Sequence, residues 1–122
     1  MSISKLKPFF DNDDIESIIE KIRDILAGNS YLTMGKYGEQ FEKEFAKYNG
    51  NVFAVACNSG TSALEIICRS LELSGHEVII PSNTFIATAN AVIAAGARPV
   101  FADIGYDMSL DPKSVESKIT KR

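Results

Sequence analysis

Three short apolar runs, separated by segments with helical periodicity, constrain the fold of this chain more than any other feature. They occupy residues 52–56, 78–80 and 100–104. Strands that are buried on both faces have such continuous apolar runs, and parallel strands need a helical crossover between them. The pattern therefore predicts an α/β chain whose mostly parallel sheet is covered by helices on both faces.

The segments between these runs carry the signals of helices. The turn at residues 58–62 opens a helix whose apolar positions recur every three or four residues. A second helix, capped by Asn83 or Thr84, is expected to run to about residue 95. A further helix begins after the Asp-Pro pair that follows residue 110, and we expect it to continue to the last residue. Residues 51–122 therefore read as the first βαβαβ part of a larger, incomplete domain.

The first fifty residues have a different pattern, with two expected helices and a loop between them. The first helix follows an acidic pair, ends at Gly28, and has this apolar face: Ile15, Ile18, Ile19, Ile22, Ile25 and Leu26. A loop is expected at residues 30–38. The second helix has Phe41, Phe45 and Tyr48 on one face and ends at Asn49 and Gly50. Residues 1–50 thus form a separate part, made of N-terminal helices and a loop.

Composition narrows the class of protein. The 122 residues are 45% hydrophobic and 24% charged, which is ordinary for a soluble globular chain. The net charge is −3 and the basic residues form no stripe, so we expect no nucleic-acid partner. The apolar stretches are far shorter than the ~20 residues of a membrane span, and the start lacks a signal-peptide pattern. We expect a cytoplasmic chain with no membrane partner, and the single histidine gives a metal site no support.

Two segments follow expected strands at the edge where parallel α/β sheets bind ligands. In the first, Gly60 lets the backbone approach a ligand, and the helix that starts there presents unpaired N–H groups to an anion. Thr61 and Ser62 add hydroxyl donors. The segment suits a phosphate, although an ordinary capped helix start has the same residues. It matches neither the Walker A nor the GxGxxG pattern.

The second segment contains Phe85, which could stack on a planar ligand or pack in the core at the start of an alanine-rich helix. Asp103 stands at the end of the third apolar run. We interpret it as a turn or cap residue and assign it no catalytic role.

Five segments in this order and spacing resemble the DegT/DnrJ/EryC1/StrS family. They are Thr33-Met34-Gly35, residues 41–46, NSGTSAL at 58–64, PSNTFIATANAV at 81–92 and GARPVFADI at 96–104. Proteins of this family are fold-type-I enzymes that depend on pyridoxal 5'-phosphate (PLP) and mostly aminate keto sugars attached to nucleotides. The resemblance covers essentially the whole chain and implies part of the large α/β/α domain of that fold.

The resemblance also implies roles for particular residues. Gly60, Thr61 and Ser62 would hold the PLP phosphate, and Phe85 would stack on the pyridine ring. The nucleotide-linked keto sugar would lie near a loop that contains Tyr31, Thr33, Met34 and Gly35. The amino donor would be an amino acid, with glutamate as our expectation, and the complete enzyme would be a homodimer.

One requirement of PLP chemistry has no counterpart in this sequence. The chemistry needs a Schiff-base lysine and an acid on the pyridine nitrogen. In the family both come later than Arg122, and none of the lysines present matches the family position. We therefore expect a truncated N-terminal fragment without catalytic residues, inactive alone. Three alternatives stay open: a sugar dehydratase of the same family, a non-catalytic remnant or binding module, and a doubly wound nucleotide-binding domain without PLP.

Overall fold

A computed structural model describes residues 8–121 of the chain. Its contacts divide the chain into two compact units, Met1–Ala56 and Cys57–Arg122, which are described separately. The division falls later than the boundary at residue 50 that we expected. Residues 52–56 stay with the first unit, since the N–H of Ala56 donates to the carboxylate of Glu42 at 2.7 Å.

The first unit begins with helix α1, Asn12–Asp24. Asp11 caps it, because its carboxylate accepts the N–H of Asp14 at 2.8 Å and so satisfies a free donor of the first turn. The helix runs into a π-helical turn, η1, Ile25–Asn29. Gly28 has φ 83 there, a left-handed conformation that glycine adopts without strain. The predicted end of the first helix at Gly28 is confirmed.

Helix α2, Lys36–Tyr48, follows a loop at residues 30–35, so the helix starts earlier than expected. Phe41 and Phe45 lie one turn apart on it, with ring centroids 5.7 Å from each other. Asn49 is the C-cap and Gly50 has φ 68, which confirms the predicted end of this helix.

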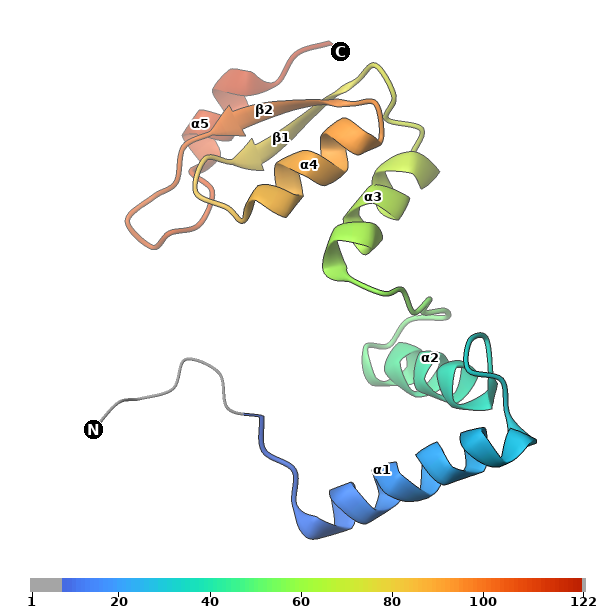
Figure 1. The fold of residues 1–122 in the computed structure, drawn as a ribbon. Coiled ribbons are helices and arrows are strands. Elements are labelled where there is room, and N and C mark those ends of the chain that lie inside the picture. Colours follow the sequence, from blue (N-terminus) through green and yellow to red (C-terminus); the bar gives the residue numbers. More distant parts are fainter. Residues whose placement is uncertain (1–7, 122) are drawn as a thin grey trace. The chain divides into compact units, whose positions relative to one another are not determined.

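The second unit contains α3 (Gly60–Ser70), β1 (Glu77–Pro81), α4 (Ile86–Ala94), β2 (Arg98–Ala102) and α5 (Pro112–Lys118). The two strands pair in parallel, from Glu77 opposite Arg98 to Pro81 opposite Ala102. Helix α4 connects them and packs against both strands, while α3 packs against α4 and α5 contacts β2 (Figure 1). This parallel pair with helical connections is the architecture that the apolar runs predict.

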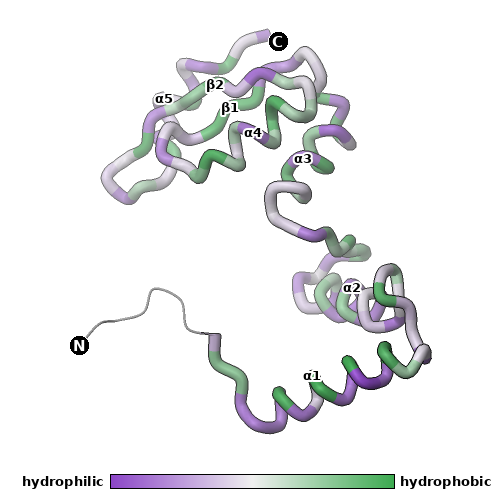
Figure 2. The backbone as a smooth tube through the Cα atoms, in the orientation of Figure 1, coloured by the Kyte–Doolittle hydropathy of each residue, from purple (hydrophilic) through white to green (hydrophobic). Residues whose placement is uncertain are grey.

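The core of the second unit lies between the sheet and helices α3 and α4. Figure 2 shows α4 as hydrophobic along most of its length, whereas purple and green segments alternate along α1. Small side chains let α4 approach its neighbours closely. The core consists of Cys68, Ile80, Ala89, Val92, Ala95 and Ala97.

Three details of the predicted elements are wrong. Residues 52–56 form no strand, because no described strand pairs with them, and Phe53 and Val55 are 85% and 81% exposed. The cap of α4 is Phe85, without a side-chain hydrogen bond, rather than Asn83 or Thr84. Helix α5 ends at Lys118, because the backbone turns extended at the next residue.

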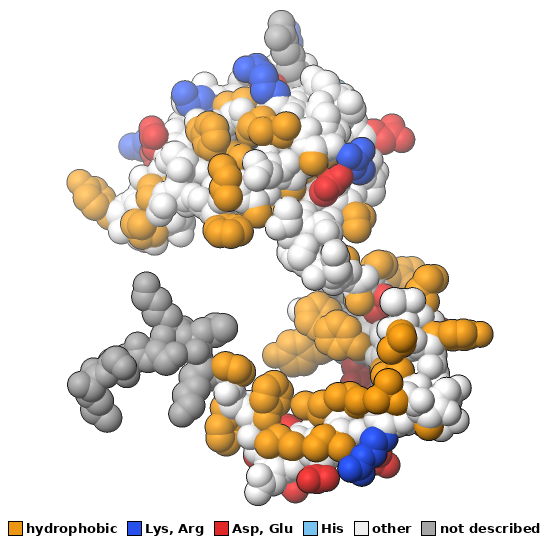
Figure 3. Space-filling view, in the orientation of Figure 1, with side chains coloured by type: hydrophobic (Ala, Val, Ile, Leu, Met, Phe, Trp, Pro, Cys, Tyr) orange, Lys and Arg blue, Asp and Glu red, His pale blue; other side chains and the backbone are white. Residues whose placement is uncertain are grey.

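Large hydrophobic side chains are exposed on both units, as Figure 3 shows. On α1, η1 and α2 they include Ile22, Leu26, Phe41 and Tyr48. Within residues 8–121, no helix has both the length and the apolar character that a membrane crossing requires.

Candidate functional site

The amino end of α3 is built around Ser59. The hydroxyl oxygen of Ser59 accepts the N–H of Ser62 at 3.1 Å, and the Ser59 carbonyl accepts the N–H of Ala63 at 3.0 Å. The Ser59 hydroxyl also donates to the hydroxyl oxygen of Ser62 at 3.1 Å. This is a capped helix start, one of the two interpretations that the sequence left open.

The cap leaves donors free for a ligand. Among the described residues, the N–H groups of Gly60 and Thr61 have no hydrogen-bond partner, because the residues four positions before them lie outside the helix. A Cβ built on Gly60 would meet nothing within 4 Å, so the space beside the Cα of Gly60 is open. Two free N–H groups at a helix amino end attract an anion such as a phosphate. The cap and the phosphate cradle are therefore compatible interpretations.

Phe85 stands where β1 gives way to α4. It is the N-cap of α4 with φ −66 and ψ 136, and its side chain is 79% exposed. The ring is therefore outside the core of the described residues. Just before it, the hydroxyls of Thr84 and Thr88 lie 3.0 Å apart and tie this turn to the first turn of α4.

The packing of α3 against α4 brings these two segments to the same end of the second unit. In Figure 1 the two helices run in the same direction, with their amino ends on the side toward which β1 and β2 point. Ligands of parallel α/β sheets bind at that edge. Asp103 is nearby in sequence, just beyond β2. Its backbone N–H donates to the Ser114 hydroxyl at 2.9 Å.

The loop of the first unit presents apolar side chains to its surroundings. Tyr31 is 82% exposed and Met34 is 94% exposed. Met34 has φ 54, in the left-handed region that a methionine seldom adopts. Thr33 lies between them at the tip of the loop, and the structure places all four of the predicted loop residues in residues 30–35.

Gly35 ends the loop at a position where only glycine fits. A Cβ on this residue would lie 2.4 Å from the carbonyl oxygen of Tyr31 and 2.6 Å from the hydroxyl oxygen of Ser30. The chain therefore folds back on itself at the N-cap of α2, where Gly35 stands. A hollow of about 460 Å³ lies beside the loop, lined by Gly28, Asn29, Ser30, Tyr31, Met34, Gly35, Lys36 and Glu39.

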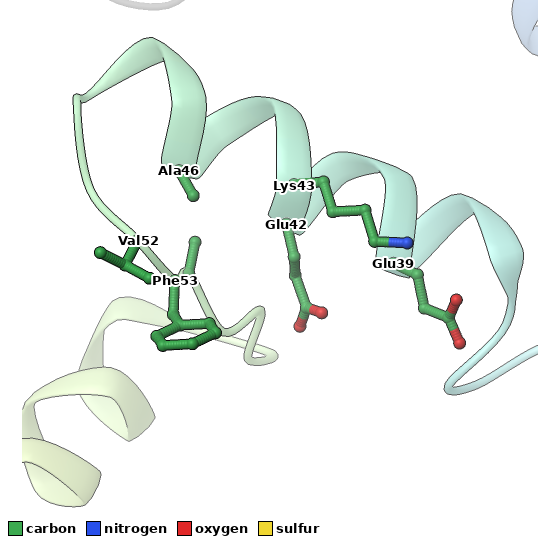
Figure 4. A pocket seen from close by; sticks show the side chains of 7 residues that line it. Glu39, Glu42, Lys43, Ala46, Val52 and Phe53 are labelled. Atoms are coloured by element: carbon green, nitrogen blue, oxygen red, sulfur yellow. The ribbon is translucent and has the colours of Figure 1, made fainter.

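A second hollow, of about 230 Å³, separates α2 from residues 52–54. Figure 4 shows Glu42 reaching from the helix into this space, with Val52 and Phe53 on the opposite side. Its walls come from α2 and from the unpaired apolar segment, and none of the predicted site residues lines it.

Asp24, the last residue of α1, holds the base of the loop. Its carboxylate accepts the hydroxyl of Tyr37 at 2.7 Å and the side-chain amide of Asn29 at 3.1 Å. It also forms an ion pair with Lys36 at 2.5 Å. Sequence analysis missed this cluster, because no local pattern links a residue at the end of one helix to the first turn of the next.

The cluster shifts the ionisation of its members. The Lys36 ammonium first, then Tyr37 and Asn29, lower the pKa of Asp24 from 3.8 to about 2. The carboxylate in turn raises the pKa of Lys36 and of Tyr37. Because the folded-state pKa of Asp24 is depressed, its stabilising contribution is present above the unfolded-state pKa. That contribution is lost as the pH falls from about 4 through about 2.

Comparison with known proteins decides the family. Residues 12–122 match the DegT/DnrJ/EryC1/StrS aminotransferase family. The chain belongs to this family. The resemblance expected from the five sequence segments is thereby confirmed.

Two curated members of the DegT/DnrJ/EryC1/StrS family illustrate the likeness. The chain is 40% identical over 111 residues to the 3-oxo-glucose-6-phosphate:glutamate aminotransferase of Bacillus subtilis, covering 89% of this chain and 25% of the relative. It is 41% identical over 111 residues to the UDP-N-acetyl-3-dehydro-alpha-D-glucosamine 3-aminotransferase of Acidithiobacillus ferrooxidans, covering 88% of this chain and 29% of the relative.

Solved structures of similar proteins share the fold. PseC of Helicobacter pylori, an aminotransferase of pseudoaminic acid biosynthesis, matches with a TM-score of 0.82 and 34% identity over 94% of this chain and 30% of its own. NtdA of Bacillus subtilis with bound cofactor PMP matches with a TM-score of 0.79 and 37% identity, and the match covers 99% of this chain and 29% of NtdA. A GDP-4-keto-6-deoxymannose-3-dehydratase matches with a TM-score of 0.73 and 27% identity, and the match covers 84% of this chain and 28% of the dehydratase.

These likenesses confirm the expected α/β class and the PLP-transferase fold of type I. The chain spans about a quarter to a third of the length of the relatives that it matches.

Replacing Gly35 with alanine should destabilise the first unit, because the new Cβ would overlap the Tyr31 carbonyl. We expect a loss of about 1–3 kcal/mol in the free energy of unfolding, measured by urea denaturation. Gly38→Ala is the matched control, because a Cβ there meets nothing within 4 Å in the first turns of α2. It should raise stability by about 0.5–1 kcal/mol. Equal effects of the two substitutions would contradict the close approach at Gly35.

Proposed function

We propose that this chain is the N-terminal part of a PLP-dependent aminotransferase that transfers an amino group from an amino acid to a nucleotide-linked keto sugar. The observation that carries the proposal is the amino end of α3, with the free N–H groups of Gly60 and Thr61 and open space beside the Cα of Gly60. Membership of an aminotransferase family and the PMP form of NtdA support it.

The residues present fit the cofactor that the family implies. A phosphate group carries up to two negative charges, and the positive end of the α3 dipole with two free N–H groups suits it. Thr61 and Ser62 supply hydroxyls beside those N–H groups. The exposed ring of Phe85 supplies an apolar face for a planar heterocycle. Anchoring a phosphate and stacking a ring would fix both ends of one molecule.

When bound, PLP supplies an electron sink that lets an amino group move between an amino acid and a carbonyl compound. The residues of this chain bind and orient in that reaction. Gly60 and Thr61 would hold its phosphate, and Phe85 would stack on its ring. The loop with Tyr31, Thr33, Met34 and Gly35 contacts the sugar acceptor.

We propose that the Schiff-base lysine is not among the lysines of residues 8–121. None of them lies in the turn before α3 or in the turn before α4. Lys36, the first lysine of α2, already pairs with Asp24. The catalytic role then belongs to a part of the intact enzyme that this sequence does not include, and the fragment alone would be inactive.

The proposal also covers the oligomeric state, cellular location and partners of the enzyme. We propose a homodimer in which a second subunit covers the loop at residues 30–35. In this loop Tyr31, Leu32 and Met34 are 82%, 84% and 94% exposed. Exposed apolar side chains clustered on one loop favour a protein interface. We place the enzyme in the cytoplasm, where free amino acids and nucleotide-linked sugars are available, and expect neither nucleic acid nor a membrane among its partners.

Removing the Thr61 hydroxyl tests the phosphate cradle. In the intact protein, Thr61→Val should weaken PLP binding about 10- to 100-fold, because a hydrogen bond to a charged group contributes about 1.5–3 kcal/mol. The measurement is a PLP titration followed by the absorbance of the bound cofactor. Ser70→Ala is the control, because Ser70 ends the same helix and its hydroxyl donates to the Ile67 carbonyl at 2.9 Å. An affinity that Thr61→Val leaves unchanged would show that the Thr61 hydroxyl takes no part in holding the phosphate.

A second candidate function is the sugar dehydratase, which the 27% identity to a GDP-4-keto-6-deoxymannose-3-dehydratase favours. Product analysis separates the two. Incubation of the intact protein with PLP, glutamate and a nucleotide-linked keto sugar should yield an amino sugar and 2-oxoglutarate in equal amounts. A deoxy sugar without nitrogen would identify a dehydratase. If neither product forms while PLP binds, the binding-module alternative stands. A keto sugar phosphate should be tested alongside, since the Bacillus subtilis relative is named for one.

A further inference from the structure

Asp24 gathers partners from both sides of the loop at residues 30–35. Asn29 is the last residue of η1, just before the loop, and its amide lies 3.1 Å from one carboxylate oxygen of Asp24. Lys36 and Tyr37 open α2, just after the loop, and lie 2.5 Å and 2.7 Å from the other oxygen. One carboxylate thus joins the two ends of the loop to the end of α1.

These contacts are hydrogen bonds and an ion pair to a charged carboxylate, which are stronger than contacts between neutral groups. An ionised carboxylate makes hydrogen bonds about twice as strong as those between neutral groups. The depressed pKa of Asp24 agrees with such partners, because they favour the charged form. Asp24 is half-buried, with a side chain that is 25% exposed, whereas Lys36 is 52% exposed. The carboxylate is therefore the less exposed member of the ion pair, and it contacts all three partners.

The backbone on both sides of the loop depends on this anchor. Gly28 turns the chain with φ 83 on one side, and Gly35 folds back against the Tyr31 carbonyl on the other. Glycine is flexible in the unfolded chain, so such turns need outside contacts to hold one conformation. The Asp24 carboxylate supplies these contacts directly beside both turns, and the hollow of about 460 Å³ lies against the same loop.

We propose that Asp24 is a positioning residue for the sugar acceptor, which holds the loop of Tyr31–Gly35 in the conformation that contacts the sugar. The inference rests on the proposed function, because that function assigns the loop to the acceptor. Asp24 touches no substrate itself and acts through Asn29, Lys36 and Tyr37.

This role predicts that a change at Asp24 affects the half-reaction with the sugar acceptor and spares the half-reaction with the amino donor. All three partners of Asp24 lie in the first unit, whereas Gly60, Thr61 and Phe85 belong to the second. Loosening the loop should therefore weaken the use of the sugar acceptor. The reaction of the cofactor-loaded enzyme with the amino donor, in the absence of sugar, should continue as before.

The experiment compares Asp24→Asn with the wild type in the intact, PLP-loaded protein. We expect the KM for the keto sugar to rise about tenfold, equivalent to about 1.4 kcal/mol, and the rate of the donor half-reaction to stay within about twofold. Asn keeps the shape of the side chain but lacks the charge that orders Lys36. Tyr37→Phe removes a single hydrogen bond and serves as a milder second variant, expected to raise the KM by a smaller factor.

Glu20→Gln is the matched control, because it removes one carboxylate charge from the same helix, at an exposed position outside the Asp24 cluster. It should leave both half-reactions unchanged. Asp24→Glu keeps the charge and should recover part of the acceptor KM, which a loss caused by general unfolding would not do. An unchanged acceptor KM in Asp24→Asn, or an equal loss in both half-reactions, would overturn the proposal.

Hydrogen exchange separates this inference from the proposed function. Amides of residues 30–37 should exchange at least about tenfold faster in Asp24→Asn than in the wild type, whereas those of α3 and α4 should not change. If the wild type transfers no amino group, the proposed function fails. If the loop amides also exchange alike in both proteins, Asp24 does not hold the loop and the positioning role is excluded as well.

Discussion

The parallel pairing of β1 with β2 is the constraint on which the candidate cofactor site depends. Parallel strands cannot be joined by a tight turn, so the chain must cross over through α4. The crossover makes the carboxyl end of β1 lead straight into the amino end of α4, where Phe85 stands. Because α3 packs on α4, its own amino end, with the free N–H groups of Gly60 and Thr61, is brought to the same edge.

The first unit is held together by different interactions from the second. Its helices bury little apolar surface against each other, and Ala46 is the one residue of α1 and α2 that is buried. The order of its loop therefore depends on polar contacts, with the Asp24 carboxylate at their centre. A loop held by a few charge-assisted contacts is easier to retune than one held by a packed core.

The sequence predicted the elements that depend on local chemistry. Left-handed glycines end α1 and α2 where Gly28 and Gly50 stand, and the strands near residues 79 and 100 follow from continuous apolar runs. It failed for residues 52–56, because a strand exists only with a hydrogen-bonded neighbour and none is present among the described residues.

The details of the candidate site were less predictable than the elements. Ser59 was within reach of sequence reasoning, because serine just before a helix is a favoured N-cap. The Asp24 cluster was not, since it joins residues up to 13 positions apart whose approach is set by the turn between two helices. The exposure of Phe85 also could not be read from the sequence, where an aromatic residue in an alanine-rich segment is equally typical of a core.

The measurement that tests the central claim most directly is a crystal structure of the intact protein with PLP bound. The account predicts phosphate oxygens about 2.7–3.2 Å from the amide nitrogens of Gly60 and Thr61, with the cofactor ring against the side chain of Phe85. A phosphate bound elsewhere, with both N–H groups left to solvent, would contradict it.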